Sequence, residues 1–142
     1  MSLNVLVVDD SAVMRSMIIR TLRMSGVPVD EIHEAADGVE GLEQLSRNWI
    51  DLALVDINMP VMNGEEFIER VRAEPETRDL SVVVVSTEAS ETRIARLREG
   101  GAGFVHKPFR PETLREEILQ ITGMPDDWGQ SSETVSGGGS DF

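Results

Sequence analysis

The 142-residue sequence has no cysteine and no tyrosine, and aromatic residues make up only 4% of it. The absence of cysteine excludes disulfide bonds, thiol catalysis and cysteine-ligated zinc sites. The only imidazoles are those of His33 and His106. We therefore expect that any metal ion bound by this chain is one that prefers oxygen ligands.

Basic residues are also scarce, since 13 Lys and Arg stand against 26 Asp and Glu, for a formal net charge of −13. A chain of this charge repels a phosphate backbone, so we expect no direct binding to nucleic acid. No apolar run approaches the ~18 residues of a membrane-spanning helix, and the first residues form neither a basic leader nor a small-residue cleavage site. The composition predicts a cytoplasmic protein without membrane insertion, and the length predicts one compact domain.

Short β-branched runs alternate with longer stretches in which apolar residues recur every three or four positions. This alternation is typical of an α/β fold with a parallel sheet. The runs at 51–55 and 81–85 are almost entirely apolar, which indicates central strands covered on both faces. The five predicted strands are residues 4–8, 31–35, 51–55, 81–85 and 103–106.

A helix is predicted after each strand, with Ser11 as the N-cap of the first and Gly26 as its stop. The first helix is expected at 12–25, and the second begins near residue 37. The third follows the turn at Asn63-Gly64 and ends at Pro75. The fourth lies within 90–101, and the fifth is expected at 111–121 with Pro111 in the first turn. The apolar positions expected on core faces of the first two are Met14, Met17, Ile18, Leu22, Val39, Leu42 and Leu45. The methionines of the first helix, Met14, Met17 and Met24, are expected to be adaptable core or partner surface.

The fourth helix carries only Ile94 and Leu97 as large apolar anchors, so we expect it to be weakly held and mobile. After residue 122 the chain is rich in Gly, Ser, Asp and Pro. This composition predicts a flexible tail at 123–142 that follows a domain of residues 1–122.

Polar side chains follow four of the five predicted strands. In open parallel sheets ligands bind at the carboxyl ends of the strands, so we expect these side chains to meet at one edge. They are Asp9 and Asp10 after the first strand, Asp56 after the third, Ser86 and Thr87 at the end of the fourth, and His106 and Lys107 at the end of the fifth. Strand alternation turns His106 away from its neighbours, and we expect it to be structural.

Three clustered carboxylates repel one another, and a hard dication such as Mg²⁺ removes that repulsion. Adjacent Asp9 and Asp10 alone would more often be a solvated helix cap, but their register with Asp56 and Lys107 favours a metal site. A lysine and a hydroxyl beside such an ion suit a phosphoryl group. The pattern therefore predicts phosphoryl transfer with an aspartate as acceptor.

Four segments, "VVDDS", "DLALVDINMPVMNG", "VVVVSTEA" and "GAGFVHKPF", occur in this order. Together they resemble the receiver domain of two-component response regulators, and the stand-alone chemotaxis type in particular, over roughly residues 3–122. The resemblance implies a doubly wound, flavodoxin-like sheet of five parallel strands in the order 2-1-3-4-5, flanked by five helices. It also implies a signalling switch that assists its own phosphorylation and dephosphorylation. A sensor histidine kinase or phosphotransfer protein would supply the phosphoryl group, and a downstream protein target would bind the switched form.

By this resemblance Asp56 is the phosphoacceptor. Asp10, Asp56 and the backbone carbonyl of Asn58 would bind Mg²⁺ or Mn²⁺, and Asp9 would reach the ion mainly through water. Lys107 would pair with a phosphoryl oxygen.

The resemblance also implies a conformational switch, in which Ser86 turns its hydroxyl toward the phosphoryl group and Phe104 swings inward. Thr87 competes with Ser86 for this role, because the stretch from there to Lys107 is one residue shorter than is usual in the family. Phe104 replaces the commoner tyrosine, so it can act only through packing, and plain core is its alternative role.

Further expectations from the family concern the surroundings of the site. Asn58 and Glu88 would influence how fast water removes the phosphoryl group, and the Lys107–Pro108 peptide bond would be cis, as about one X-Pro bond in twenty is. The partner face would comprise the helix within 90–101, the strand 103–106 and the helix 111–121.

Three other interpretations compete with a stand-alone receiver domain. An Mg²⁺-dependent phosphatase of the haloacid dehalogenase type places its nucleophile and its acid two residues apart on the first strand, whereas Asp9 and Asp10 are adjacent. A flavodoxin-like electron carrier needs a Ser/Thr-rich phosphate loop and flavin-stacking aromatics, which "DDSAVMRS" and the absence of tyrosine do not supply. The third is that the chain is the receiver fragment of a longer regulator, with "SGGGS" as the start of a linker.

Overall fold

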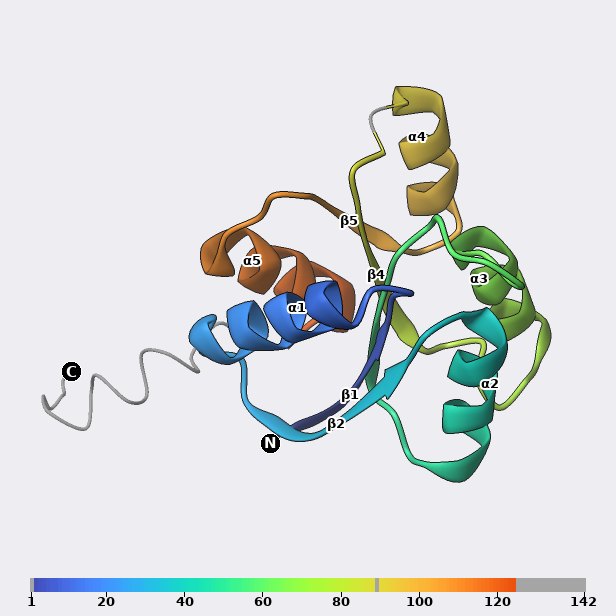
Figure 1. The fold of residues 1–142 in the computed structure, drawn as a ribbon, viewed down its shortest axis with the longest axis horizontal. Helices are drawn as coiled ribbons and strands as arrows, with labels where there is room; N and C mark the ends of the chain where they lie inside the picture. Colours follow the sequence, from blue (N-terminus) through green and yellow to red (C-terminus); the bar gives the residue numbers. More distant parts are fainter. Residues whose placement is uncertain (1, 89, 125–142) are drawn as a thin grey trace, which may run out of the picture.

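Five parallel strands form one sheet in the order β2-β1-β3-β4-β5, as Figure 1 shows for a computed structural model of the chain. The structure describes residues 2–88 and 90–124, so most of the predicted tail lies outside the described residues. The strands are β1 (Leu3–Val8), β2 (Val29–Ala35), β3 (Leu52–Val55), β4 (Ser81–Ser86) and β5 (Gly103–His106). The predicted fold class and strand order are confirmed.

Five helices connect and cover the strands. They are α1 (Ala12–Met24), α2 (Gly38–Arg47), α3 (Gly64–Ala73), α4 (Glu91–Glu99) and α5 (Pro111–Thr122). Helices α1 and α5 pack on one face of the sheet, and α2, α3 and α4 lie on the other (Figure 1). None of the helices within the described ranges has the length and apolar character needed to cross a membrane.

The three central strands carry the core. Side chains of β1 alternate between the two faces, with Leu6 and Val8 in the cluster under α2, α3 and α4, and Val5 and Val7 in the cluster under α1 and α5. Every residue of β3 is fully buried. The apolar runs therefore form central strands covered on both faces, as the sequence predicted.

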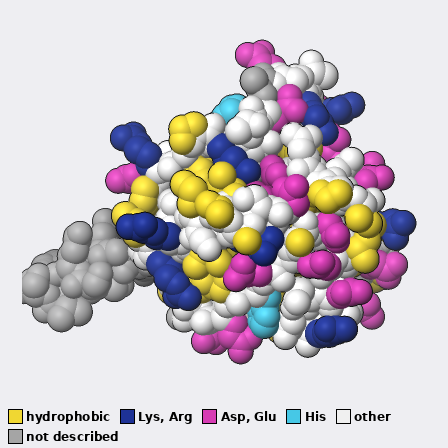
Figure 2. Space-filling model, viewed as in Figure 1, with side chains coloured by type: hydrophobic (Ala, Val, Ile, Leu, Met, Phe, Trp, Pro, Cys, Tyr) yellow, Lys and Arg dark blue, Asp and Glu magenta, His cyan; other side chains and the backbone are white. Residues whose placement is uncertain are grey.

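The expected core positions of α1 and α2 are partly wrong. Ile18 and Leu22 are fully buried, but Met17 is 53% exposed and Val39 is 39% exposed. Successive helical residues are rotated by about 100°, so Met17 lies to the side of the Ile18–Leu22 row. Figure 2 shows apolar side chains on the face where α1 runs, and the exposed large ones of this helix are Val13, Met17 and Met24.

Helix α4 is anchored lightly, as expected from its sequence. Leu97 is its one buried residue, and Ile94 packs against the core from the rim. The other residues of its nine-residue span are exposed, apart from the half-buried Arg93.

Candidate functional site

The acidic site lies where β1 and β3 end side by side. The Asp9 N–H donates to the Ala35 carbonyl at 3.1 Å, and the Asp56 N–H donates to the Val8 carbonyl at 2.9 Å, so the parallel pairing continues to both aspartates. Immediately after Asp10 the chain turns into α1, where the Ser11 hydroxyl accepts from the Met14 N–H at 3.1 Å. The sheet and the helix cap together fix where the acids stand.

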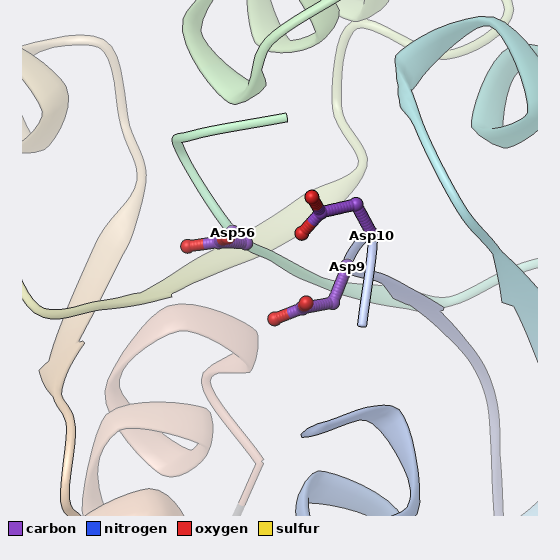
Figure 3. Close-up of side chains that lie close together, drawn as sticks. All are labelled: Asp9, Asp10 and Asp56. Carbon is purple, nitrogen blue, oxygen red and sulfur yellow. The ribbon is translucent and has the colours of Figure 1, made fainter. Parts of the chain in front are cut away.

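Asp9, Asp10 and Asp56 form one cluster (Figure 3). One carboxylate oxygen from each lies within 4.8 Å of the other two. Asp9 is 1% exposed and Asp56 is 7% exposed, while Asp10 lies at the open rim. Three oxygen ligands at this spacing, with one side open, are a donor set that could hold a hard cation.

Lys107 reaches the same cluster from the end of β5. Its backbone N–H donates to the Ser86 carbonyl at 2.9 Å, and the Lys107–Pro108 peptide bond is cis, as the resemblance implied. The ammonium Nζ lies 3.1 Å from Asp9 Oδ2 and 3.6 Å from Asp56 Oδ1. One positive charge thus stands between two buried carboxylates.

The electrostatics of Asp56 follow from this arrangement. Burial raises the pKa of the Asp56 carboxyl, and the nearby charges of Asp9 and Asp10 raise it further. The charge of Lys107 and a hydrogen bond from the Ile57 backbone act in the opposite direction but do not cancel the rise in pKa. Burial and the two neighbouring carboxylates thus both disfavour the charged form of Asp56, and a divalent cation in the acidic cluster would favour it.

Arg15, which the sequence analysis missed, holds the loop between β1 and α1. Its Nη1 donates to the Asp9 carbonyl at 2.6 Å and its Nε to Glu34 Oε1 at 2.9 Å. The Asp9 carboxylate also accepts from the Ser11 N–H at 2.9 Å. The signal that could have indicated Arg15 is a cation close to a helix N-terminus, where the helix dipole disfavours it.

Gly64 brings the β3–α3 loop against the backbone of Asp56. The Gly64 N–H donates to the Ile57 carbonyl at 2.8 Å, and a Cβ at position 64 would lie 2.2 Å from the Asp56 carbonyl oxygen. The sequence indicated a turn at Asn63-Gly64. In the structure Asn63 caps α3 reciprocally with Glu66.

The candidate switch residues lie at the end of β4, for Ser86 and Thr87, and within β5, for Phe104. Ser86 is fully buried and its Oγ accepts from the Glu88 N–H at 3.2 Å, whereas Thr87 is exposed. Phe104 is 4% exposed and its ring meets that of exposed His106 edge-on, with centroids 4.8 Å apart. His106 is therefore not turned away from all its neighbours, because residues two apart on a strand share a face.

The remaining predicted residues flank the site. Asn58 is exposed, two residues after Asp56. Glu88 is half-buried in the β4–α4 loop, where its carboxylate binds Arg93.

Comparisons with known proteins give one consistent result. Residues 5–119 match the family described as the response regulator receiver domain. A chemotaxis protein CheY homolog of Campylobacter jejuni is 37% identical over 123 residues, which cover 85% of this chain and 93% of that protein. The chemotaxis protein CheY1 of Helicobacter pylori is 35% identical over 126 residues, which cover 87% of this chain and 100% of that protein. The solved structure of the chemotaxis protein CheY4 of Vibrio cholerae is 35% identical, with a TM-score of 0.74, and the match covers 85% of this chain and 99% of that one.

Proposed function

This chain belongs to the response regulator receiver domain family, and on that premise we propose that Asp56 accepts a phosphoryl group from a sensor histidine kinase or a phosphotransfer protein. The observation that carries the proposal is the position of its carboxylate, clustered with Asp9 and Asp10 and 3.6 Å from Lys107 Nζ. A buried carboxylate that has an ammonium group on one side and oxygen donors for a metal ion on the other is suited to act as a nucleophile toward phosphorus.

In the proposed reaction an Asp56 carboxylate oxygen attacks the phosphorus of a phosphohistidine. The O–P bond forms as the P–N bond breaks, the electron pair returns to the imidazole nitrogen, and that nitrogen takes up a proton. Lys107 Nζ, already between two carboxylates, is placed to pair with a phosphoryl oxygen.

We assign the metal ligands to Asp10, Asp56 and the backbone carbonyl of Asn58, with Asp9 acting mainly through water. The ion would be Mg²⁺ or Mn²⁺, because every proposed donor is an oxygen. When bound, the cation neutralises charge on the phosphoryl oxygens and favours the ionised form of Asp56. The clustering of carboxylate oxygens from Asp9, Asp10 and Asp56 within 4.8 Å of one another supports this assignment, because a dication would offset the repulsion among them.

The output of the proposed switch is a change of shape. We assign the switch hydroxyl to Ser86, because it is buried at the end of β4, the strand next to β3, while Thr87 is exposed. We assign Phe104 the coupled packing change. Lightly anchored α4, with β5 and α5, then forms the face that binds a downstream protein. Asn58 and Glu88 modulate the access of water to the phosphoryl group.

The relatives named as chemotaxis proteins support a stand-alone, chemotaxis-type regulator, with residues 1–122 as the receiver domain and 123–142 as a tail. The alternative is a receiver that forms part of a longer regulator. In both cases the charge of −13 opposes direct binding of these 142 residues to nucleic acid, so we assign their output to protein contact.

The test is phosphorylation by acetyl phosphate in the presence of Mg²⁺, followed by intact-mass measurement. We expect one acid-stable, base-labile adduct of about 80 Da, the mass that a phosphoryl group adds, and we expect chelation of Mg²⁺ to prevent it. Asp56→Asn should abolish the adduct. Asp51→Asn, at the other end of β3, is the matched control and should retain it. An adduct that persists in Asp56→Asn would contradict the proposal.

A further inference from the structure

Arg93, on the first turn of α4, joins three separate parts of the molecule. Its Nη1 lies 2.8 Å from Glu88 Oε1 in the β4–α4 loop, and its Nη2 lies 2.9 Å from Glu65 Oε1 on the first turn of α3. The bond to Glu65 is the main cause that raises the pKa of Arg93, and the contacts with Glu88 add to it. The ionic cluster therefore links Glu88 in the β4–α4 loop to helix α3, whose Phe67 and Val71 are buried in the core.

Glu88 transmits this restraint to the candidate switch residue. While its Oε1 binds Arg93, its Oε2 accepts from the Ser90 N–H at 2.9 Å. Its own backbone N–H donates to Ser86 Oγ at 3.2 Å. If the Ser86 side chain turns toward a phosphoryl group on Asp56, it breaks this bond unless Glu88 moves as well.

We propose that Arg93 is a positioning residue for the phosphorylation site, because it ties Glu88 to Glu65 and so holds the β4–α4 loop in the arrangement in which the Ser86 hydroxyl bonds the loop backbone. This inference rests on the proposed function. In the proposed role, Arg93 contacts neither the phosphoryl group nor the metal ion. It acts by opposing the movement of the β4–α4 loop that phosphorylation requires.

The exposure of the cluster sets the size of the effect. The side chains of Glu88, Arg93 and Glu65 are 17%, 27% and 29% exposed, so solvent weakens their ion pairs without removing them. Pairs of this kind contribute little individually, and we expect their loss to shift the loop equilibrium about two- to fivefold. The cluster biases the switch but does not lock it.

Arg96 provides a matched control on the same helix. Its Nη2 also pairs with Glu65, but at 3.6 Å, and its side chain is 66% exposed. Arg93→Gln and Arg96→Gln each remove one positive charge from the same face of α4. A general charge effect would therefore appear in both variants, whereas a positioning effect would appear mainly in Arg93→Gln.

The experiment measures the affinity of each variant for beryllofluoride with Mg²⁺, a stable phosphoryl mimic, from the amide NMR signals of Ser86, Glu88 and Phe104. We expect Arg93→Gln to bind about two- to fivefold more tightly than the wild type, Arg93→Lys to lie between them, and Arg96→Gln to match the wild type. Glu65→Gln breaks the same link from α3 and should bind more tightly as well, which keeps the test decisive if Arg93→Gln folds poorly.

The outcomes separate this inference from the proposed function. The role of Arg93 is overturned if Arg93→Gln, Glu65→Gln and Arg96→Gln all bind beryllofluoride with the same affinity. The proposed phosphorylation site still stands in that case if Asp56→Asn no longer binds the mimic. If the wild type does not bind beryllofluoride, or Asp56→Asn binds it equally well, both the proposed function and the role of Arg93 are overturned.

Discussion

Two loops follow the neighbouring central strands β3 and β4, and they are held in place by different kinds of contact. The β3–α3 loop closes on its own backbone through the bond from the Gly64 N–H to the Ile57 carbonyl, and Ile57 is fully buried. The β4–α4 loop has an exposed Thr87, and its described contacts come mainly from the side chains of Glu88 and Arg93. The first loop carries the proposed phosphoacceptor, and the second carries the residues proposed to respond to it.

The helix caps at the ends of the two loops differ in the same way, since the cap after the β3–α3 loop has more hydrogen bonds than the cap after the β4–α4 loop. Asn63 and Glu66 cap α3 reciprocally at 2.9 and 3.0 Å, whereas Ser90 caps α4 by one bond from the Arg93 N–H at 3.3 Å. Backbone bonds closed over a packed core resist displacement, but partly exposed side-chain pairs exchange with water more readily. The site therefore combines a fixed chemical group with a loop whose position costs little to change.

The substitution expected to have the largest effect is Gly64→Ala, which disturbs the tightly packed β3–α3 loop. A Cβ at position 64 would meet the Asp56 carbonyl oxygen at 2.2 Å, so the β3–α3 loop must move away from β3. We expect the free energy of unfolding, measured in urea, to fall by about 2 to 3 kcal/mol, as for an overpacked core. The rate of phosphorylation by acetyl phosphate should fall as well, because the Asp56 backbone is displaced.

Gly100→Ala is the control for that substitution, since Gly100 caps α4 and the nearest atom to its added Cβ, the Leu97 carbonyl oxygen, is 3.5 Å away. We expect a change under about 0.5 kcal/mol, as at an ordinary surface position. Similar losses in the two variants would show that the β3–α3 loop is not the tightly packed one.

A smaller effect, of opposite sign, is expected from Asp56→Asn in the absence of divalent ions. Because burial raises the pKa of Asp56 above its model-compound value of 3.8, the folded state binds more protons than the unfolded state between those two pKa values. The contribution of Asp56 to stability is therefore fully present below pH 3.8 and is lost as the pH rises through its folded pKa. Relative to the wild type, the variant should gain stability over that window and remain on the order of 1 kcal/mol more stable at pH 7.

The measurement is urea unfolding of both proteins across pH 3 to 8, with chelator present. Asp51→Asn is the contrasting case, because Asp51 accepts from the Asn4 N–H at 2.8 Å and from Trp49 Nε1 at 3.0 Å, and it should lose stability. If Asp56→Asn is instead less stable than the wild type at neutral pH, then Lys107 outweighs burial at this carboxylate.

Much of the fixed part of the molecule could be predicted from the sequence. The runs "DLALV" and "SVVVV" indicate buried parallel strands, because an almost continuous apolar run without alternation is typical of a strand covered on both faces. Once those strands are parallel and adjacent, Asp9 and Asp56 must end at the same edge, and the observed cluster with Asp10 follows from that rule.

The sequence did not reveal the contacts that depend on how helices dock on the sheet. The bonds of Arg93 to Glu65 and of Arg15 to Glu34 span 28 and 19 residues, and periodicity within one element carries no information about them. The exposure of Met17 has the same origin, because the docking of α1 decides which side of its apolar stripe is covered. In the β4–α4 loop the sequence indicated Ser86 and Glu88 but not the Arg93–Glu65 bond that holds Glu88 toward α3.

The smallest expected effect concerns Val61, which lies in the β3–α3 loop with φ at 67° and is 80% exposed. A β-branched residue in the left-handed region is strained by about 1 kcal/mol or more, and asparagine adopts that conformation more readily. We expect Val61→Asn to raise the free energy of unfolding by about 0.5 to 1 kcal/mol in urea. Val13→Asn, at a position 72% exposed on α1, carries no such strain and should show no gain.

The two valine variants also locate the strain within the site. Val61 stands at the rim of the loop whose inner side Gly64 and Ile57 fix, so relief of its backbone strain should leave the Asp56 carboxylate in place. We therefore expect the gain in stability to come without a change in the rate of phosphorylation by acetyl phosphate. A gain that is accompanied by slower phosphorylation would mean that the strained turn, and not only the packing around Gly64, sets the position of the phosphoacceptor.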